Sequence, residues 1–180
     1  FGGNTSCIYI CLENGHDVIL DSGTGIIELG DRLEKTQHPI NILLTHNHWD
    51  HIQGFPYFKP IFQINRKIDI VSGEIDGDDK RAVLTQMSGS THPVKFQQLP
   101  ADISVHVEQS KKPNFEIPGF KINTQRLNHP DGGTAYCLMA EGKKVAYVTD
   151  NELNSPDVKN TSWQQWLEFI ADADMLIHDA

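Results

Sequence analysis

Short apolar runs separated by turn residues recur along the chain and are typical of β-strands. The clearest pair is residues 7–12 and 17–20, joined by Asn14-Gly15, a strong signal for a β-hairpin. A second hairpin is predicted over residues 135–149, with its turn at Glu141-Gly142. The other strands predicted from this pattern are 40–44, 68–72, 103–107, a pair within 115–125, and 175–177.

Apolar residues at helical spacing predict helices between several of these strands. The predicted helices span 26–36, 52–58 and 78–87, and a further one begins at Ser162, which forms a capping-box pattern with Gln165. Helices mixed with hairpin strands in this way favour an α/β fold in which helices cover sheets. A length of 180 residues suits one domain, which we expect to span residues 1–180.

The composition is that of an ordinary globular domain, with 38% hydrophobic and 22% charged residues. No apolar run reaches the roughly 20 residues that a membrane helix needs, so we expect no membrane partner. The formal net charge of −9 argues against a broad nucleic-acid surface, which needs clustered Lys and Arg. A small anionic substrate held by metal ions stays open, whereas a long nucleic acid is disfavoured.

The three cysteines are an odd number, and Cys7 and Cys11 share one expected strand. Their separation is about 13 Å at roughly 3.3 Å per residue, which is too long for a disulfide. We therefore expect buried free thiols, which suit a reducing cytoplasm, the compartment that we predict. The first residues, Phe1 to Asn4, contain neither an initiator Met nor a secretory leader. We therefore expect a processed chain or a fragment of a longer one.

The densest chemistry lies in residues 45–51, Thr-His-Asn-His-Trp-Asp-His, directly after a predicted buried strand. In a strand, His46 and His48 point the same way. A turn that leaves the strand can swing the next two polar residues, Asp50 and His51, toward the same point. Imidazole and carboxylate are borderline-to-hard donors that suit zinc, iron or manganese. We therefore predict that these four side chains are metal ligands.

Three further residues near strand ends are candidates for the same site: His129, Asp150 and Asp21. Each has an ordinary alternative, because a His before Pro is usually a turn residue and an Asp after a strand usually caps a helix or forms a turn. The cluster at 45–51 favours His129 and Asp150 as ligands, and Asp21 as a residue that orients a ligand histidine. The isolated histidines are expected to be solvated or in the core; they are His16, His38, His92 and His106.

The order His46-x-His48-x-Asp50-His51, then His129, then Asp150, resembles the signature of the metallo-β-lactamase superfamily. The resemblance implies a four-layer αββα sandwich with the site at one edge. It also implies that His46, His48 and His129 hold one metal ion, that Asp50 and His51 hold a second, and that Asp150 bridges both. The implied cofactors are two divalent metal ions, with zinc as the first choice and manganese or iron as alternatives.

Two stretches further along the chain resemble one branch of that superfamily. Residues 128–136 and 149–152 look more like the phosphodiesterase branch, which contains ribonuclease Z and cyclic-phosphodiester hydrolases, than like antibiotic-degrading members. One departure concerns the last ligand of the second metal ion, which the superfamily normally supplies from a later Gly-His-Ser stretch that this sequence lacks. His178 is the one histidine after Asp150, and we expect it to be a candidate general acid rather than a ligand. The chain is therefore expected to be truncated at both ends relative to the superfamily domain.

The resemblance implies a hydrolase whose nucleophile is a hydroxide that bridges two metal ions, with Asp50 accepting a hydrogen bond from it. The favoured substrate is a small phosphodiester such as a cyclic nucleotide. Three alternatives stay open: hydrolysis of a lactone, thioester or β-lactam at the same centre, a diiron redox or sensor module, and a regulatory domain without turnover. The expected partner is a small-molecule ester or phosphodiester, and a homodimer is compatible with the sequence.

Overall fold

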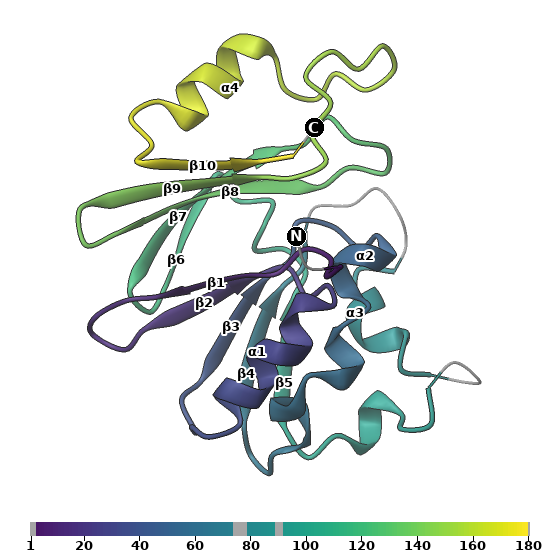
Figure 1. The fold of residues 1–180 in the computed structure, drawn as a ribbon. Coiled ribbons are helices and arrows are strands. Elements are labelled where there is room, and N and C mark those ends of the chain that lie inside the picture. Colours follow the sequence, from purple (N-terminus) through teal and green to yellow (C-terminus); the bar gives the residue numbers. More distant parts are fainter. Residues whose placement is uncertain (1–2, 74–78, 89–91, 180) are drawn as a thin grey trace.

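The computed structural model describes residues 3–73, 79–88 and 92–179, and in this part of the chain the strands form two five-stranded sheets (Figure 1). The first sheet has the strand order β1-β2-β3-β4-β5, and its strands are β1 (Ile8–Cys11), β2 (Asp17–Leu20), β3 (Ile40–Leu43), β4 (Lys67–Val71) and β5 (Asp102–His106). The second sheet has the order β10-β9-β8-β7-β6, and its strands are β6 (Asn114–Ile117), β7 (Phe120–Arg126), β8 (Thr134–Ala140), β9 (Lys143–Val148) and β10 (Met175–His178). Strands β2 to β5 are parallel to one another, as are β9 and β10, and the other described pairs are antiparallel.

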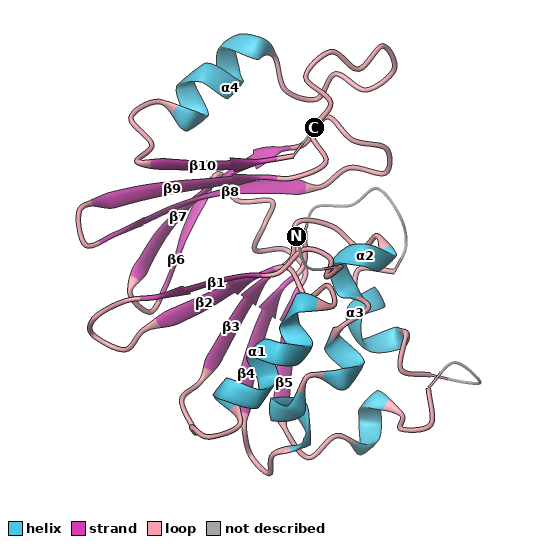
Figure 2. Cartoon of the chain, in the orientation of Figure 1, coloured by secondary structure: helices cyan, strands magenta, loops and turns pink. Residues whose placement is uncertain are grey.

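Helices cover the outer faces of both sheets, which gives four layers (Figure 2). On the side of the first sheet lie α1 (Gly25–Leu33), α2 (Trp49–Ile52), α3 (Ala82–Thr85) and three short 3-10 turns, η1 (Phe55–Tyr57), η2 (Lys59–Phe62) and η3 (Phe96–Gln98). On the side of the second sheet lies α4 (Trp163–Ile170). The structure therefore confirms the predicted αββα sandwich.

The alternation of side chains along β2 and β3 divides the core into layers. Ile19 and Ile42 face the helices of the first sheet, whereas Val18, Leu20 and Leu43 face the second sheet. All five are buried, and each contributes about 1.5–3 kcal/mol through the apolar surface it removes from water. Both faces of the first sheet are thus apolar along its central strands, which holds the two sheets together.

The last helix binds the second sheet through one large aromatic side chain. Trp166 of α4 is buried against Leu127, Ala135 and Val148. The helix begins at the predicted capping box, in which the Ser162 hydroxyl oxygen accepts a hydrogen bond from the Gln165 backbone N–H. That cap fixes where the helix starts and which face meets the sheet.

Two predicted helices differ from the structure. The stretch 52–58 was expected to begin a helix, but α2 begins earlier, at Trp49, and the chain then forms the 3-10 turns η1 and η2. Pro56 and Pro60 lie at the starts of these turns, and proline removes a backbone donor that a longer α-helix would need.

The helix predicted over 78–87 is also shorter in the structure, where α3 spans Ala82–Thr85. Asp78 lies outside the described residues. The Asp79 carboxylate accepts a hydrogen bond from the Arg81 backbone N–H, which holds this segment in a turn before the helix begins.

Cys7, Cys11 and Cys137 are free thiols, as expected, but only Cys137 is buried, whereas Cys7 is partly buried and Cys11 is exposed. Among the described helices, none has the length and apolar character that a bilayer crossing requires.

A substitution at Gly54 tests the close packing of the segment after α2 against the turn after β2. A Cβ atom on Gly54 would lie 2.1 Å from the backbone oxygen of Gly23. We expect Gly54→Ala to lower the free energy of unfolding by about 3 kcal/mol, the upper end for overpacking, because backbone must move. Gly3→Ala is the matched control, since no atom lies within 4 Å of its Cβ position. Equal denaturant midpoints for the two variants would contradict this packing.

Candidate metal centre

The predicted site residues lie on loops and on the short helix α2 at one edge of the sandwich. Because β2 and β3 are parallel, the loops that follow them start at the same edge, and these loops carry Asp21 and His46. Asp150 follows β9 in the second sheet, and His129 lies between β7 and β8. The site is therefore built from both sheets.

The loop after β3 is fastened to the second sheet by its backbone. The carbonyl oxygen of Thr45 accepts a hydrogen bond from the Thr134 N–H at 2.8 Å, and the carbonyl of Leu44 accepts one from the Tyr136 hydroxyl at 2.7 Å. Gly133 has φ of +147°, and a Cβ atom there would lie 2.7 Å from the Leu127 side chain and 3.4 Å from His46 Cβ. Glycine lets the loop that carries His129 pass close to His46.

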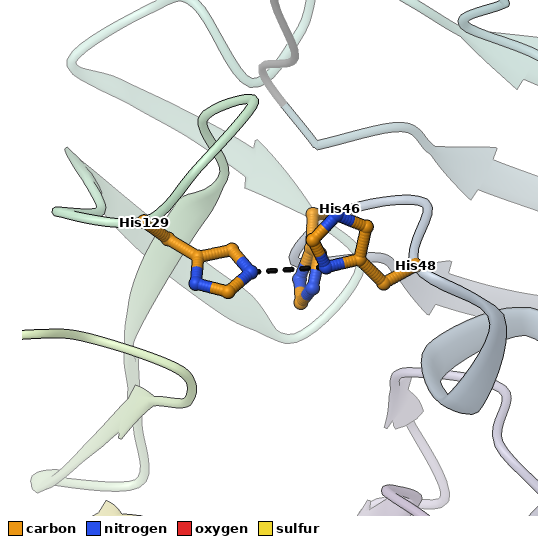
Figure 3. Close-up of side chains that lie close together, drawn as sticks. All are labelled: His46, His48 and His129. Atoms are coloured by element: carbon orange, nitrogen blue, oxygen red, sulfur yellow. Dashed lines mark hydrogen bonds between the residues drawn. The ribbon is translucent and has the colours of Figure 1, made fainter. Parts of the chain in front are cut away.

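Three of the predicted ligands, His46, His48 and His129, form one group of imidazoles (Figure 3). The ring centroid of His46 lies 4.5 Å from that of His48 and 4.8 Å from that of His129. His129 Nε2 and His48 Nδ1 are 3.0 Å apart. Since each imidazole nitrogen lies about 2.0–2.1 Å from a bound zinc ion, one ion can bridge that gap.

A second group shares His46 and adds His51 and Asp150. Asp150 Oδ2 lies 2.6 Å from His51 Nε2 and 3.5 Å from His46 Nε2. Asp50, on the first turn of α2, brings its Oδ2 atom to 3.3 Å from the same His51 nitrogen. The structure thus brings five of the six predicted ligand residues together in two donor groups, and the sixth, Asp50, lies beside His51 but belongs to neither group.

Asp21 is fully buried directly behind His51. Its Oδ2 atom lies 2.8 Å from His51 Nδ1, which leaves Nε2 of that ring facing Asp150. The Asp21 carboxylate also accepts hydrogen bonds from the backbone N–H and the hydroxyl of Thr45, at 2.7 and 3.0 Å. A carboxylate in this position orients the ring of a ligand histidine.

The side chains present fit a metal ion. His46 Nε2 is buried and makes no hydrogen bond within the described part of the chain. A buried polar atom without a partner costs about 1–3 kcal/mol, so it calls for a bound group. The atoms around it are imidazole nitrogens and a carboxylate oxygen, which are the donors that zinc and related ions prefer.

The charges in the metal-free centre follow from burial and from the carboxylates. Burial, with further effects from His51 and His48, lowers the pKa of His46 to about 3. Burial acts in the same direction on His51, but hydrogen bonds to Asp150 and Asp21 outweigh it and raise that pKa to about 10. The hydrogen bond from His51 in turn holds the pKa of Asp150 below its ordinary value. His46 is therefore neutral and ready to bind a cation, whereas His51 must first release a proton.

A family model of the metallo-beta-lactamase superfamily matches residues 1–177. The chain belongs to the metallo-β-lactamase superfamily. This confirms the resemblance seen in the sequence. Members of this superfamily are mostly metallohydrolases, and the His/Asp groups here could bind a metal ion.

Several solved structures are similar in fold at low sequence identity. The metallo-beta-lactamase fold protein YhfI from Bacillus subtilis is 18% identical with a TM-score of 0.63, covering 96% of this chain and 61% of that one. Zn²⁺-bound PqqB from Methylobacterium extorquens is 17% identical with a TM-score of 0.60, covering 98% of this chain and 57% of that one. The short form of human tRNase Z is 20% identical with a TM-score of 0.62, covering 98% of this chain and 71% of that one. The chain therefore spans 61% of YhfI and 57% of PqqB, and a comparison with proteins of curated function finds no match.

A pocket of about 450 Å³ opens beside the centre of this superfamily member. Three of its lining residues are acidic, and the lining consists of His129, Asp150, Asn151, Glu152, Leu153, Asn154, His178 and Asp179. The exposed His178 thus shares a pocket with two predicted ligands but belongs to neither donor group. A pocket of this size accommodates a small molecule.

The other histidines have partners or surroundings outside the two donor groups. His106 pairs with Asp69 at 2.8 Å, and the ring of His92 packs against Tyr57 with centroids 5.8 Å apart. His16 and His38 are exposed. These positions agree with the expectation that none of them belongs to the site.

Sequence reasoning missed three residues at the site. Thr45 and Tyr147 bind Asp21, and the carboxylate of Asp131 lies near His48. The Tyr147 hydroxyl donates to Asp21 Oδ2 at 2.8 Å, and Asp131 Oδ2 lies 3.8 Å from His48 Nε2. The sequence did hint at Tyr147, because side-chain alternation along its strand directs it into the interior, near the end of the strand that is followed by Asp150.

The raised pKa of His51 predicts how the stability of the metal-free protein depends on pH. Because the folded-state pKa is about 10 and the ordinary value is 6.5, the protonated ring stabilises the fold fully below pH 6.5. This contribution is lost as the pH rises toward 10. Chemical unfolding in chelator should show falling stability between pH 6.5 and 9, and a clearly smaller decline in His51→Gln. An identical decline in the variant would contradict the assignment.

Proposed function

We propose that this chain is the metal-binding part of a hydrolase that holds two divalent metal ions and cleaves a small phosphodiester, such as a cyclic nucleotide. The observation that carries the proposal is that His46, with its unpartnered Nε2, is shared by two donor groups that also contain His48, His129, His51 and Asp150, beside an open pocket. His46, His48 and His129 would hold one ion, Asp50 and His51 the second, and Asp150 would lie between them. Zinc is our first choice because this donor set suits it, and manganese or iron would also fit.

Bound divalent ions would lower the pKa of a water molecule toward neutrality and draw charge from a phosphoryl oxygen. The protein's own residues then orient the reaction. Asp21 holds the His51 ring from behind, so that Nε2 faces the centre. The half-exposed Asp50 carboxylate can accept a hydrogen bond from the attacking water and fix its direction.

The negative charge of the pocket implies that an anionic substrate would need the metal ions in order to bind. Asp150, Glu152 and Asp179 line it, and the chain has a formal net charge of −9. An anionic phosphodiester would be repelled by these carboxylates unless bound cations compensate them. The pocket size and the net charge both favour a small substrate over a long nucleic acid.

The metal and substrate assignments can be tested together. We expect the chain with zinc to hydrolyse bis-p-nitrophenyl phosphate faster than a lactone or a chromogenic cephalosporin, and to lose that activity with chelator. His129→Ala should lower kcat/KM by about 100-fold or more, since even residues behind metal ligands are worth 10- to 100-fold. His106→Ala, outside both donor groups, is the matched control. Faster hydrolysis of the lactone would show that the proposed substrate class is wrong. Hydrolysis that is unaffected by chelator would contradict the proposed metal-dependent function.

His178 is the candidate general acid, because it lines the same pocket as His129 and Asp150. An acid matters most when the leaving alkoxide is a strong base, and it can contribute roughly 10²- to 10⁴-fold. We expect His178→Ala to slow a phosphodiester with an alkyl leaving group much more than one with nitrophenolate. Equal slowing of both substrates would remove His178 from this role.

A further inference from the structure

The buried Asp21 carboxylate is bound by residues of both sheets. It follows β2 in the first sheet, and its backbone has a φ of +60°, in the left-handed region. Thr45 donates to it from the loop after β3. Tyr147 reaches it from β9 in the second sheet, with its hydroxyl 2.8 Å from Oδ2. His51 Nδ1 lies at the same distance from Oδ2. Four donor groups therefore surround the carboxylate, which matches the roughly four hydrogen bonds that a carboxylate can accept.

Tyr147 is suited to be a permanent donor in this position. It is 1% exposed, so water does not compete for its hydroxyl. Burial first, and then the charge of Asp21, raise the pKa of the phenol far above its ordinary value. The hydroxyl therefore keeps its proton, and Oδ2 receives three donors, from Tyr147, from His51 and from the Thr45 hydroxyl. Tyr147 is the donor among them that comes from the second sheet.

We propose that Tyr147 is a positioning residue for the second metal ion, acting through Asp21 on the ring of His51. The inference rests on the proposed function, since His51 must be a ligand for its orientation to matter. Without the phenol, Oδ2 loses a donor on the side of the second sheet and the carboxylate can turn. The His51 ring would then lose the hydrogen bond that aims Nε2 at Asp150 and Asp50.

The neighbouring strand supplies a matched control. Tyr136 of β8 is paired in register with Tyr147 and is equally buried. Its hydroxyl also reaches the first sheet, but it donates to the Leu44 carbonyl at 2.7 Å, not to Asp21. Tyr→Phe at either position removes one buried hydroxyl between the sheets, and only the change at Tyr147 alters the partners of Asp21 and His51.

The test is a zinc titration of the full chain against a competing chelator, with Tyr147→Phe and Tyr136→Phe side by side. We expect Tyr147→Phe to weaken the second zinc ion about tenfold and to leave the first unchanged, since residues behind a ligand are worth 10- to 100-fold in affinity. Tyr136→Phe removes one of the two described hydrogen bonds that fasten the loop after β3 but no donor to Asp21, so it should not weaken the second ion more than the first. If a variant folds only with metal, folding measured against zinc concentration yields the same affinities by linkage.

A double-mutant cycle with Asp21→Asn separates positioning from general packing. If Tyr147 acts through Asp21, Tyr147→Phe will have no further effect on zinc affinity in the Asp21→Asn background. Additive effects, or equal losses in the two Tyr→Phe variants, would overturn the inference. A wild-type chain that binds no second zinc ion would overturn the proposed function as well. Two ions bound equally well by wild type and Tyr147→Phe would overturn this inference alone.

Discussion

The burial of one carboxylate, that of Asp21, connects the fold to its metal centre. A buried charge is costly unless hydrogen bonds replace the water it has lost. Asp21 obtains its donors from Thr45, His51 and Tyr147, which come from both halves of the sandwich. The carboxylate is therefore satisfied only when the two sheets are packed together, and the packing of the sheets places the His51 ring at the same time.

Close approach of backbone segments around the centre reinforces this coupling. A Cβ atom on Gly23 would lie 2.3 Å from the Asp50 carbonyl oxygen, and one on Gly73 would lie 2.0 Å from the Thr45 carbonyl oxygen. The loops that carry the donor side chains are thus pressed against glycines of neighbouring loops. Such contacts limit the movement of the donors before any ion binds, which is what a preorganised site requires.

The strands, several helices and the cluster at 45–51 were readable from local patterns, whereas the choice of His129 and Asp150 rested on that distant cluster. Period-2 apolar runs, the Asn14-Gly15 turn and the Ser162 capping box are short-range signals, and the strands and α4 agree with them. The region 52–62 was harder, because Pro56 and Pro60 convert an apparent helix into 3-10 turns. The role of Tyr147 depends on how the second sheet packs onto the first, a long-range relation that its strand pattern only hints at.

We propose that six side chains from three separate segments hold a pair of cations. The most direct measurement is an anomalous difference map from crystals of the chain grown with zinc. We expect two peaks roughly 3.5–4 Å apart. One should lie among His46, His48 and His129, and the other beside His51 and Asp50, with Asp150 between them. A map with no zinc among these side chains, or with zinc bound elsewhere on the chain, would contradict this proposal.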